Sequence, residues 1–307
     1  MKIGYTCINR TLACQGNKTF RLKSYSANRL IETVKNNLDC LLDILAYNVN
    51  HNILFFRVSS DLIPFASHPI CTFDWQTCFK KQFQKIGKFI TEHRMRISMH
   101  PDQFTLINSK DENIFERSAR ELQYHAHVLD AMGLDTSAKI QIHVGGTYGD
   151  RQASIERFVA RYKILETAIK RRLVIENDHT QYTLAECLLI SSTTGIPVLF
   201  DVFHHAINCS GESINEALQR VVTTWKKKDG LPMVDYSSQK KRARPGSHAE
   251  TIDAKGFKKF LVATQSYDID IMLEIKDKEN SALKAIQAAQ HDKRFTESYF
   301  SYPVNST

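Results

Sequence analysis

Six short apolar runs in this chain each end at a histidine or a carboxylate. Those end residues are His100, His143, Glu176, Asp201, Asp235 and Glu274, and successive members lie 25 to 43 residues apart. Each interval fits one strand followed by one helix. Because a parallel α/β barrel keeps its functional side chains at the carboxyl ends of its strands, the pattern predicts a barrel with these side chains at one mouth.

Eight runs are predicted to be strands, and several are unbroken rather than alternating, as expected of strands covered on both faces. They span residues 2–5, 53–58, 96–99, 139–144, 173–176, 197–201, 232–236 and 271–274. Helical spacing is present around 30–45 and 115–129, and over 154–171, 183–194, 213–228, 254–266 and 280–290. We therefore predict an α/β fold: a single-domain TIM-type (β/α)8 barrel over residues 1–278, followed by a C-terminal helix and tail over 279–307.

The charge balance favours a polyanionic partner. The chain has 41 Lys and Arg against 33 Asp and Glu, a formal net charge of +8. A buried carboxylate cluster would lower this total, so the solvent-exposed face is expected to be more basic than the sum. A basic balance alone does not identify nucleic acid as the partner.

Cysteine usage and the N-terminus bear on the compartment. Seven cysteines form an odd set without a C-x-x-C pair, which argues against a secreted disulfide framework and a thiolate zinc site. We expect reduced intracellular thiols. The start MKIGYTCINR has no apolar signal core, and no stretch approaches the roughly 18 apolar residues of a membrane span. A cytoplasmic location, with the genomic DNA, is expected, without membrane association.

The candidate ligands are histidines and carboxylates, without a thiolate. Asp201 and His204 form a D-x-x-H step that can turn two ligands toward one site, whereas His205 would point elsewhere. His248 lies in a loop-like stretch after the seventh strand. The densest basic cluster of the chain precedes it: Lys240, Lys241, Arg242 and Arg244. A solvated loop with a structural histidine remains the alternative interpretation of this stretch.

This donor set selects Zn, Mn, Fe or Mg over copper or iron–sulfur clusters. More than four ligands imply more than one ion, and Glu176 can bridge a pair. Two or three adjacent cations can ionise a water, neutralise phosphate oxygens and stabilise a leaving alkoxide. The residues thus predict phosphodiester hydrolysis by multi-metal-activated water.

Several longer motifs resemble one family. They are GYTCIN at 4–9, RVSSDLIPFASHP ending at 69, SMHPDQF at 98–104, IHVGGTYG at 142–149, IENDH, FDVFHHAIN, SSQKKRARPGSHA and MLEIKDKE. Through these motifs the chain resembles, nearly end to end, the UV-damage endonucleases, which are related to the endonuclease IV group of abasic-site nucleases. The resemblance implies a DNA repair endonuclease that nicks double-stranded DNA immediately 5′ to cyclobutane dimers and 6-4 photoproducts. It would leave a 3′-hydroxyl and need no nucleotide cofactor.

The resemblance also implies roles for single residues. Carried over by motif, the catalytic residues are Glu176, His68, His100 and His143, with His68 beside the scissile phosphate or the metals. The metal ligands are His100, His143 and Glu176 for one ion; Glu176 as a bridge with Asp201, Asp235 and Glu274 for a second; and His204 with His248 for a third. The DNA-binding residues are the probe pair Gln103 and Phe104, then Tyr5 and Asn9 on the lesion side; the basic residues Lys240, Lys241, Arg242 and Arg244 join them.

The chain departs from the family pattern at three positions. The family commonly has Lys-x-His where this chain has Met233, Val234 and Asp235, which excludes a lysine ligand there. A carboxylate-rich second site favours Mn, with Zn or Mg as alternatives, and two or three ions per chain are expected. The usual probe pair is Gln-Tyr, and Phe104 lacks the hydroxyl, so lesion range or affinity could differ.

Three other functions remain open on the sequence. An abasic-site endonuclease of the endonuclease IV type would use the same ions. A metal-dependent sugar isomerase would place similar ligands at barrel strand ends. A non-catalytic damaged-DNA-binding protein on an inactive barrel is the third, because Asp235 replaces a histidine. A monomer is expected.

Overall fold

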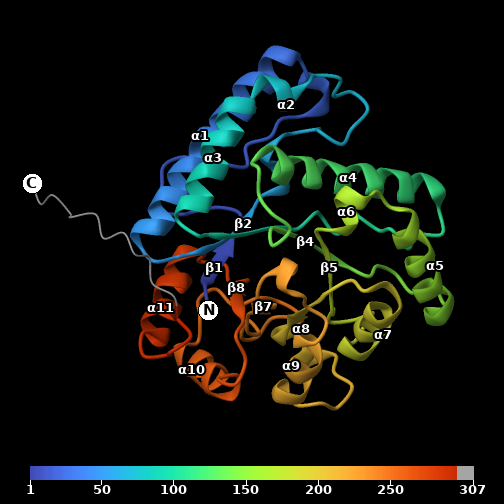
Figure 1. The fold of residues 1–307 in the computed structure, drawn as a ribbon, viewed down its shortest axis with the longest axis vertical. Coiled ribbons are helices and arrows are strands. Elements are labelled where there is room, and N and C mark those ends of the chain that lie inside the picture. The colour runs from blue at the N-terminus through green and yellow to red at the C-terminus, as the bar shows by residue number, and fades with distance from the viewer. Residues whose placement is uncertain (296–307) are drawn as a thin grey trace, which may run out of the picture.

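The computed structural model describes residues 1–295 and shows a closed barrel of eight parallel strands (Figure 1). Strands adjacent in the sequence are adjacent in the sheet, and β8 closes on β1 with Ile271 opposite Ile3. The strands are β1 Ile3–Thr6, β2 Phe55–Val58, β3 Arg96–Met99, β4 Lys139–His143, β5 Leu173–Glu176, β6 Val198–Asp201, β7 Met233–Tyr236 and β8 Asp270–Leu273. The predicted (β/α)8 barrel is confirmed.

Helices surround the barrel, and several of them bury one apolar face. In α1, for example, Leu30, Val34 and Leu38 lie on the buried face, and the Ser26 hydroxyl caps the first turn by accepting from Arg29 N at 3.3 Å. The helices are α1 Ala27–Asn50, α2 Trp75–Cys78, α3 Lys80–Glu92, α4 Glu112–Ala131, α5 Arg151–Ile164, α6 Thr167–Lys170, α7 Leu184–Thr194, α8 Val202–Ile207, α9 Ile214–Val222, α10 Ala254–Ala263 and α11 Glu279–Ala289. Short 3-10 turns are η1 Leu22–Ser24, η2 Ser60–Leu62 and η3 Lys227–Asp229.

Two predicted helices are shorter than the sequence indicated. The predicted helix over 154–171 is broken at Leu165, whose backbone is extended, into α5 and α6. The helix predicted to run to residue 228 ends at Val222, because the next residues bind to the start of β6: the Trp225 indole donates to Val198 O at 2.7 Å. Tertiary hydrogen bonds override helical spacing at these positions.

The expectation of seven free thiols is wrong. Cys14, in the loop after β1, forms a disulfide with Cys40 of α1, with their Cα atoms 5.7 Å apart. Spacing could not reveal this pair, because the bond joins residues 26 apart that are brought together only by folding. The other five cysteines are free.

The C-terminal helix α11 follows β8 and packs against α10 and β1 (Figure 1). The division of the chain at residue 278 stays a prediction, and the tail beyond residue 295 lies outside the described residues. Within residues 1–295, every helix is too short or too polar to cross a bilayer.

Candidate metal centre

The residues at the strand ends converge on one mouth of the barrel. His143 ends β4, Glu176 ends β5 and Asp201 ends β6, while His100 and Glu274 directly follow β3 and β8. The side chains form three groups, and within each group the ligand atoms lie within 4.8 Å of one another. The groups are His100, His143 and Glu176; Glu176, Asp201 and His204; and Asp201, Asp235 and Glu274. Adjacent groups share a carboxylate, so the arrangement can hold neighbouring cations.

Glu176 is central to the first two groups. Its Oε2 lies 3.6 Å from His100 Nε2 and 4.0 Å from His143 Nε2, and its Oε1 lies 3.1 Å from His204 Nδ1. His204 reaches it from the first turn of α8, where the Asp201 carboxylate caps the helix by accepting from His204 N at 2.6 Å. The D-x-x-H step therefore brings both side chains to the site. His205 points away, with its Nε2 3.0 Å from Glu212 O.

Arg57 and Gln141 are two site residues that sequence reasoning missed. The Arg57 guanidinium, 3% exposed, donates to Asp235 Oδ2 at 2.7 Å, to Gln141 Oε1 at 2.7 Å and to Glu274. The Gln141 amide donates to Glu176 Oε2 at 2.5 Å and to Asp235 Oδ2 at 2.6 Å. This network fixes three of the carboxylates. Its signal in the sequence is a polar residue inside an otherwise apolar strand, FFRV and KIQIH.

The electrostatics are those of an acidic interior. Burial raises the pKa of Asp201 well above its usual range and that of Asp235 to about 7. Burial is the largest single effect on Glu274 and acts to raise its pKa, but Arg57 together with His248 and His100 lowers that pKa to about 2. Burial acts to lower the pKa of His204, yet Asp201 and Glu176 raise it to about 10. The site therefore contains more negative charge than its own cations compensate.

The unpaired atoms of the site fit divalent cations. Among the described residues, Asp201 Oδ2, Asp235 Oδ1 and His143 Nδ1 are buried without a hydrogen-bond partner. Asp201 Oδ2 lies 3.4 Å from His204 Nδ1, which is too long for a good hydrogen bond, and Asp235 Oδ1 has no hydrogen-bond partner among the described residues. Buried polar atoms are normally paired, so this ligand group can accept a further positive partner. Oxygen and imidazole donors without thiolate suit Mn, Zn or Mg.

Two predicted residues lie at the edge of the site or outside it. His248 Nε2 is 3.8 Å from Glu274 Oε2, and the centroid of its ring lies 6.3 Å from that of His204 in an edge-to-face arrangement. His248 belongs to none of the three groups. His68 is exposed on the loop after β2; its Nδ1 accepts from Ile70 N at 3.1 Å, and it also belongs to none of them.

A cavity of about 470 Å³ opens over the ligands. It is lined by Thr6, Cys7, Arg57, His100, Pro101, Gln103, His143, His248, Glu274, Ile275, Lys276 and Lys278. Gln103 thus reaches the mouth, and the adjacent Phe104 is 72% exposed. Because this aromatic ring is exposed beside a charged cavity, a planar group of a binding partner can stack on it.

Tyr5 and Asn9 are buried. The Tyr5 hydroxyl, fully enclosed, donates to Asn48 Oδ1 at 2.8 Å and accepts from Asn9 Nδ2 at 2.9 Å. Asn9 Oδ1 in turn accepts from Thr11 N at 2.9 Å. In this conformation neither side chain offers a surface to DNA, because both are used to hold the loop after β1.

The basic loop lies beside the mouth, where Gln239 and His248 form a β-bridge. Lys241, Arg242 and Arg244 are exposed, and Lys240 forms an ion pair with Glu250 at 2.5 Å. Three of the four predicted cations are therefore presented to solvent without an ion-pair partner in the part of the chain that the structure describes.

Comparisons with known proteins agree with this geometry. The family described as UV-endonuclease UvdE matches residues 1–299. The chain is 40% identical over 292 residues to a UV DNA damage endonuclease of Clostridium perfringens (strain 13 / Type A), covering 94% of this chain and 70% of the relative. The crystal structure of SacUVDE superposes with a TM-score of 0.91 at 45% identity, covering 94% of this chain and 98% of that one.

More distant structures share the fold alone. Endonuclease IV from Thermus thermophilus has a TM-score of 0.54 at 14% identity, covering 81% of this chain and 93% of that one. D-psicose 3-epimerase from Clostridium cellulolyticum H10 has a TM-score of 0.55 at 12% identity, covering 84% and 94%. Nucleases and sugar epimerases are both in this set, so the barrel itself does not decide the chemistry.

Proposed function

The chain belongs to the UV-endonuclease UvdE family, and from that membership we propose that it nicks the DNA backbone immediately 5′ to UV photoproducts and leaves a 3′-hydroxyl. Cyclobutane dimers and 6-4 photoproducts are the proposed lesions. The single observation that carries the chemistry is the convergence of His100, His143 and Glu176 with the adjoining carboxylates on one mouth.

Residues of the three ligand groups would hold two or three divalent ions, with Mn favoured by the carboxylate-rich third group. Ions there would supply water activation and charge neutralisation at the phosphate. The chain's own contribution is to hold the ligands. Gln141 fixes one oxygen of Glu176, and Arg57 fixes Asp235 and Glu274, so the cage does not need to reorganise during the reaction.

Recognition of the lesion is assigned to the loop after β3. A photodimer stacks and pairs poorly, so it costs less to flip out than normal bases, and a flat side chain can replace the lost stacking. The exposed ring of Phe104 and the neighbouring Gln103 at the mouth support this role. Lys241, Arg242 and Arg244 would contact backbone phosphates, while Tyr5 and Asn9 would act by positioning the loop after β1.

His68 and His248 are proposed to act from the edge of the ligand cage. His248 lies close enough to Glu274 and His204 to join an ion held there. His68, exposed on the loop after β2, could reach a phosphate only from outside the cage. We propose that the enzyme acts as a monomer inside the cell on the genomic DNA.

The test is nicking of one UV-irradiated duplex against its undamaged control, after chelation, with metals supplied one at a time. Cutting 5′ to the dimer in the presence of Mn is expected. Cutting only at abasic sites, with none on the irradiated duplex, would contradict the proposal. It would indicate an abasic-site endonuclease of the endonuclease IV type instead. The sugar isomerase and the non-catalytic binder are not favoured, because family membership spans residues 1–299 and the ligand cage is intact.

A further inference from the structure

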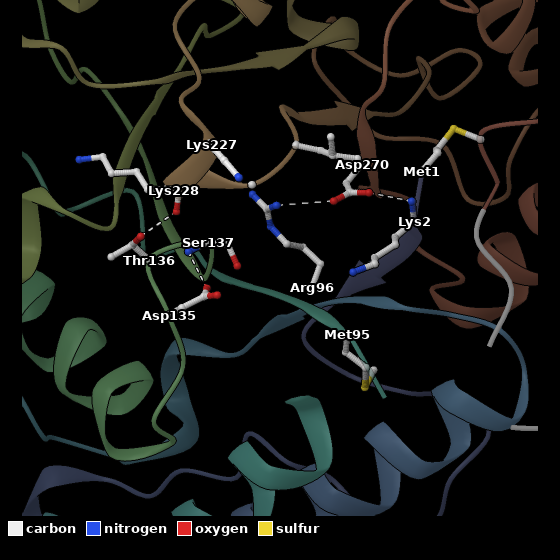
Figure 2. Close-up of a pocket in the computed structure, with 12 residues that line it drawn as sticks. Met1, Lys2, Met95, Arg96, Asp135, Thr136, Ser137, Lys227, Lys228 and Asp270 are labelled. Carbon is white, nitrogen blue, oxygen red and sulfur yellow. Dashed lines mark hydrogen bonds and ion pairs between the residues drawn. The ribbon is translucent and has the colours of Figure 1, made fainter. Parts of the chain in front are cut away.

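Figure 2 shows the residues that line a second cavity, of about 500 Å³. Their positions along the strands place it at the opposite end of the barrel from the metal centre. The residues around it precede strands or begin them: Lys2 comes before β1, Arg96 begins β3 and Asp270 begins β8. The metal ligands end or follow strands instead. A strand of four residues spans roughly 13 Å, so the barrel core separates the two sites.

Positive charge exceeds negative charge around this cavity. Four cationic side chains line it, Lys2, Arg96, Lys227 and Lys228, against two carboxylates, Asp135 and Asp270. Both carboxylates are already engaged. Asp270 Oδ1 accepts from Lys2 N at 2.7 Å and its Oδ2 lies 3.6 Å from Arg96 Nη1, while Asp135 Oδ1 accepts from Ser137 N at 2.8 Å. Lys227 and Lys228 are exposed at the rim.

Among these four cationic side chains, Arg96 is deeply buried. It is 4% exposed and lies at the centre of the labelled side chains, with Asp270 and Lys2 on one side and Ser137 on the other (Figure 2). Its Nη2 donates to Asp229 O at 2.9 Å, but its Nε has no hydrogen-bond partner among residues 1–295. Burial lowers the pKa of Arg96 and of Lys2 despite Asp270. Arg96 thus keeps one donor without an acceptor, and its positive charge adds to that of the cavity wall.

The backbone at position 230 passes so close to the Arg96 guanidinium that only glycine fits there. Gly230 has a φ of 75°, and a Cβ built on it would lie 2.1 Å from Arg96 Nη1. The hydroxyl of Thr136 donates to Lys228 O at 2.7 Å, which ties the loop before β4 to η3. The cavity is thus a built feature: the loop before β4 is tied to η3, and η3 carries Lys227 and Lys228 beside Arg96.

We propose that this cavity binds a small phosphate-bearing molecule of about the size of a nucleoside monophosphate. A guanidinium with several ammonium groups suits phosphate oxygens. An adjoining cavity of about 250 Å³ shares Lys2 and Asp135 with the first and is lined by Ile90, Ile97 and Leu134, which suits a less polar part of the same ligand. The site is separate from the metal centre and does not depend on the proposed nuclease function.

The experiment is a calorimetric titration of the full-length Mn-loaded protein with dTMP, inorganic phosphate and thymidine at low salt. The variant is the double substitution Lys227→Glu/Lys228→Glu at the rim. The matched control is Lys240→Glu/Lys241→Glu beside the metal centre, which reverses the same two charges at the other end. Nicking of irradiated duplex by the rim variant checks that it is folded.

We expect dTMP to bind the wild-type chain more tightly than thymidine. The rim variant should bind it about tenfold more weakly or worse, with nicking retained, because two attractive charges near the phosphate become repulsive. The control variant should bind dTMP at this site as the wild type does, and inorganic phosphate should follow the same pattern. Absence of dTMP binding, equal binding of thymidine, or a loss in the control variant with none in the rim variant would each overturn the proposal.

Discussion

The two ends of this barrel have opposite charge surpluses, although the same strands build both. β3 begins with Arg96 and is followed by His100, and β8 begins with Asp270 and is followed by Glu274. At the carboxyl ends, the carboxylates Glu176, Asp201, Asp235 and Glu274 outnumber the cations Arg57 and His204. At the amino ends, cations outnumber Asp135 and Asp270. Buried charge without a partner is unfavourable. Each end is therefore arranged to accept a ligand of the opposite sign.

The comparison is tested most severely at Glu176. Glu176→Gln keeps the shape of the side chain but removes the charge that faces His100, His143 and His204, and we expect nicking to fall by roughly a thousandfold or more. Single-turnover nicking of an irradiated duplex measures this. Affinity for the same duplex should stay within about twofold of the wild type, because the exposed contacts are unchanged.

The same variant distinguishes the ends. If Glu176→Gln nicked at the wild-type rate, the ligand cage would not be the catalytic centre. Wild-type dTMP binding at the amino end is expected in this variant, since the two sites share no residue.

Arg57→Met removes a buried cation from the carboxyl end of the barrel, which carries the metal ligands and is called the acidic end below. Asp235 and Glu274 then lose their ion pairs, and we expect the metal-free protein to lose about 3–5 kcal/mol of unfolding free energy. Bound Mn supplies positive charge, so the loss should be smaller in the loaded protein. Urea unfolding with and without Mn measures both values. Lys35→Met, which breaks an exposed pair with Asp39, is the control and should leave stability nearly unchanged; equal losses with and without Mn would contradict the account.

The strand-end ligands could be predicted because the signal is local. A strand covered on both faces is an apolar run, and a His, Asp or Glu at its end is visible in the sequence. His100, Glu176 and Asp201 were identified in this way, and the structure brings their side chains together. The closed order of strands follows from the same repetition.

Contacts between distant segments could not be predicted. Arg57 and Asp235 are 178 residues apart and meet only because β2 and β7 face each other across the barrel interior. The Cys14–Cys40 disulfide and the cavity around Arg96 have the same origin, since they depend on which loops the closed sheet brings together. A charged residue inside an apolar run, as in FFRV, is the signal that was available.

The acidic end should also respond to pH in the metal-free protein. The pKa of Asp235 is raised from 3.8 to about 7, so the folded state binds more protons than the unfolded state between those values. This contribution to stability is complete below pH 3.8 and is lost as the pH rises through about 7. Mn needs the ionised carboxylate, so the Mn-induced rise in Tm should be about 5 °C or more larger at pH 8 than at pH 5.

Thermal unfolding at the two pH values, with Mn and with chelator, measures this difference. Asp235→Asn cannot titrate and should reduce it, leaving the part due to Asp201. A Mn effect that does not change with pH in the wild type would show that these carboxylates are not the ligands.

Phe104→Ala tests the surface of the acidic end rather than its interior. Removal of the exposed ring should weaken binding to the irradiated duplex by about tenfold, the loss expected for one base–aromatic stack. Fluorescence anisotropy measures the affinity. Phe104→Tyr keeps the ring and adds the hydroxyl of the usual probe pair, so it should bind at least as tightly as the wild type. Mn binding should be equal in all three proteins. An unchanged affinity in Phe104→Ala would remove this ring from lesion recognition.

The smallest effect expected concerns the exposed cations at each end. Lys241→Ala/Arg244→Ala should weaken duplex binding several-fold and reduce the slope of log affinity against log salt by about two, because each phosphate contact releases about one counterion. Lys227→Ala/Lys228→Ala removes the same charge from the amino end and should change neither the affinity nor the slope. Salt titrations of duplex binding separate these outcomes. Equal changes in both variants would mean that DNA contacts both ends of the barrel. That result would contradict the distinction between a cation-binding carboxyl end that faces DNA and an anion-binding amino end that does not.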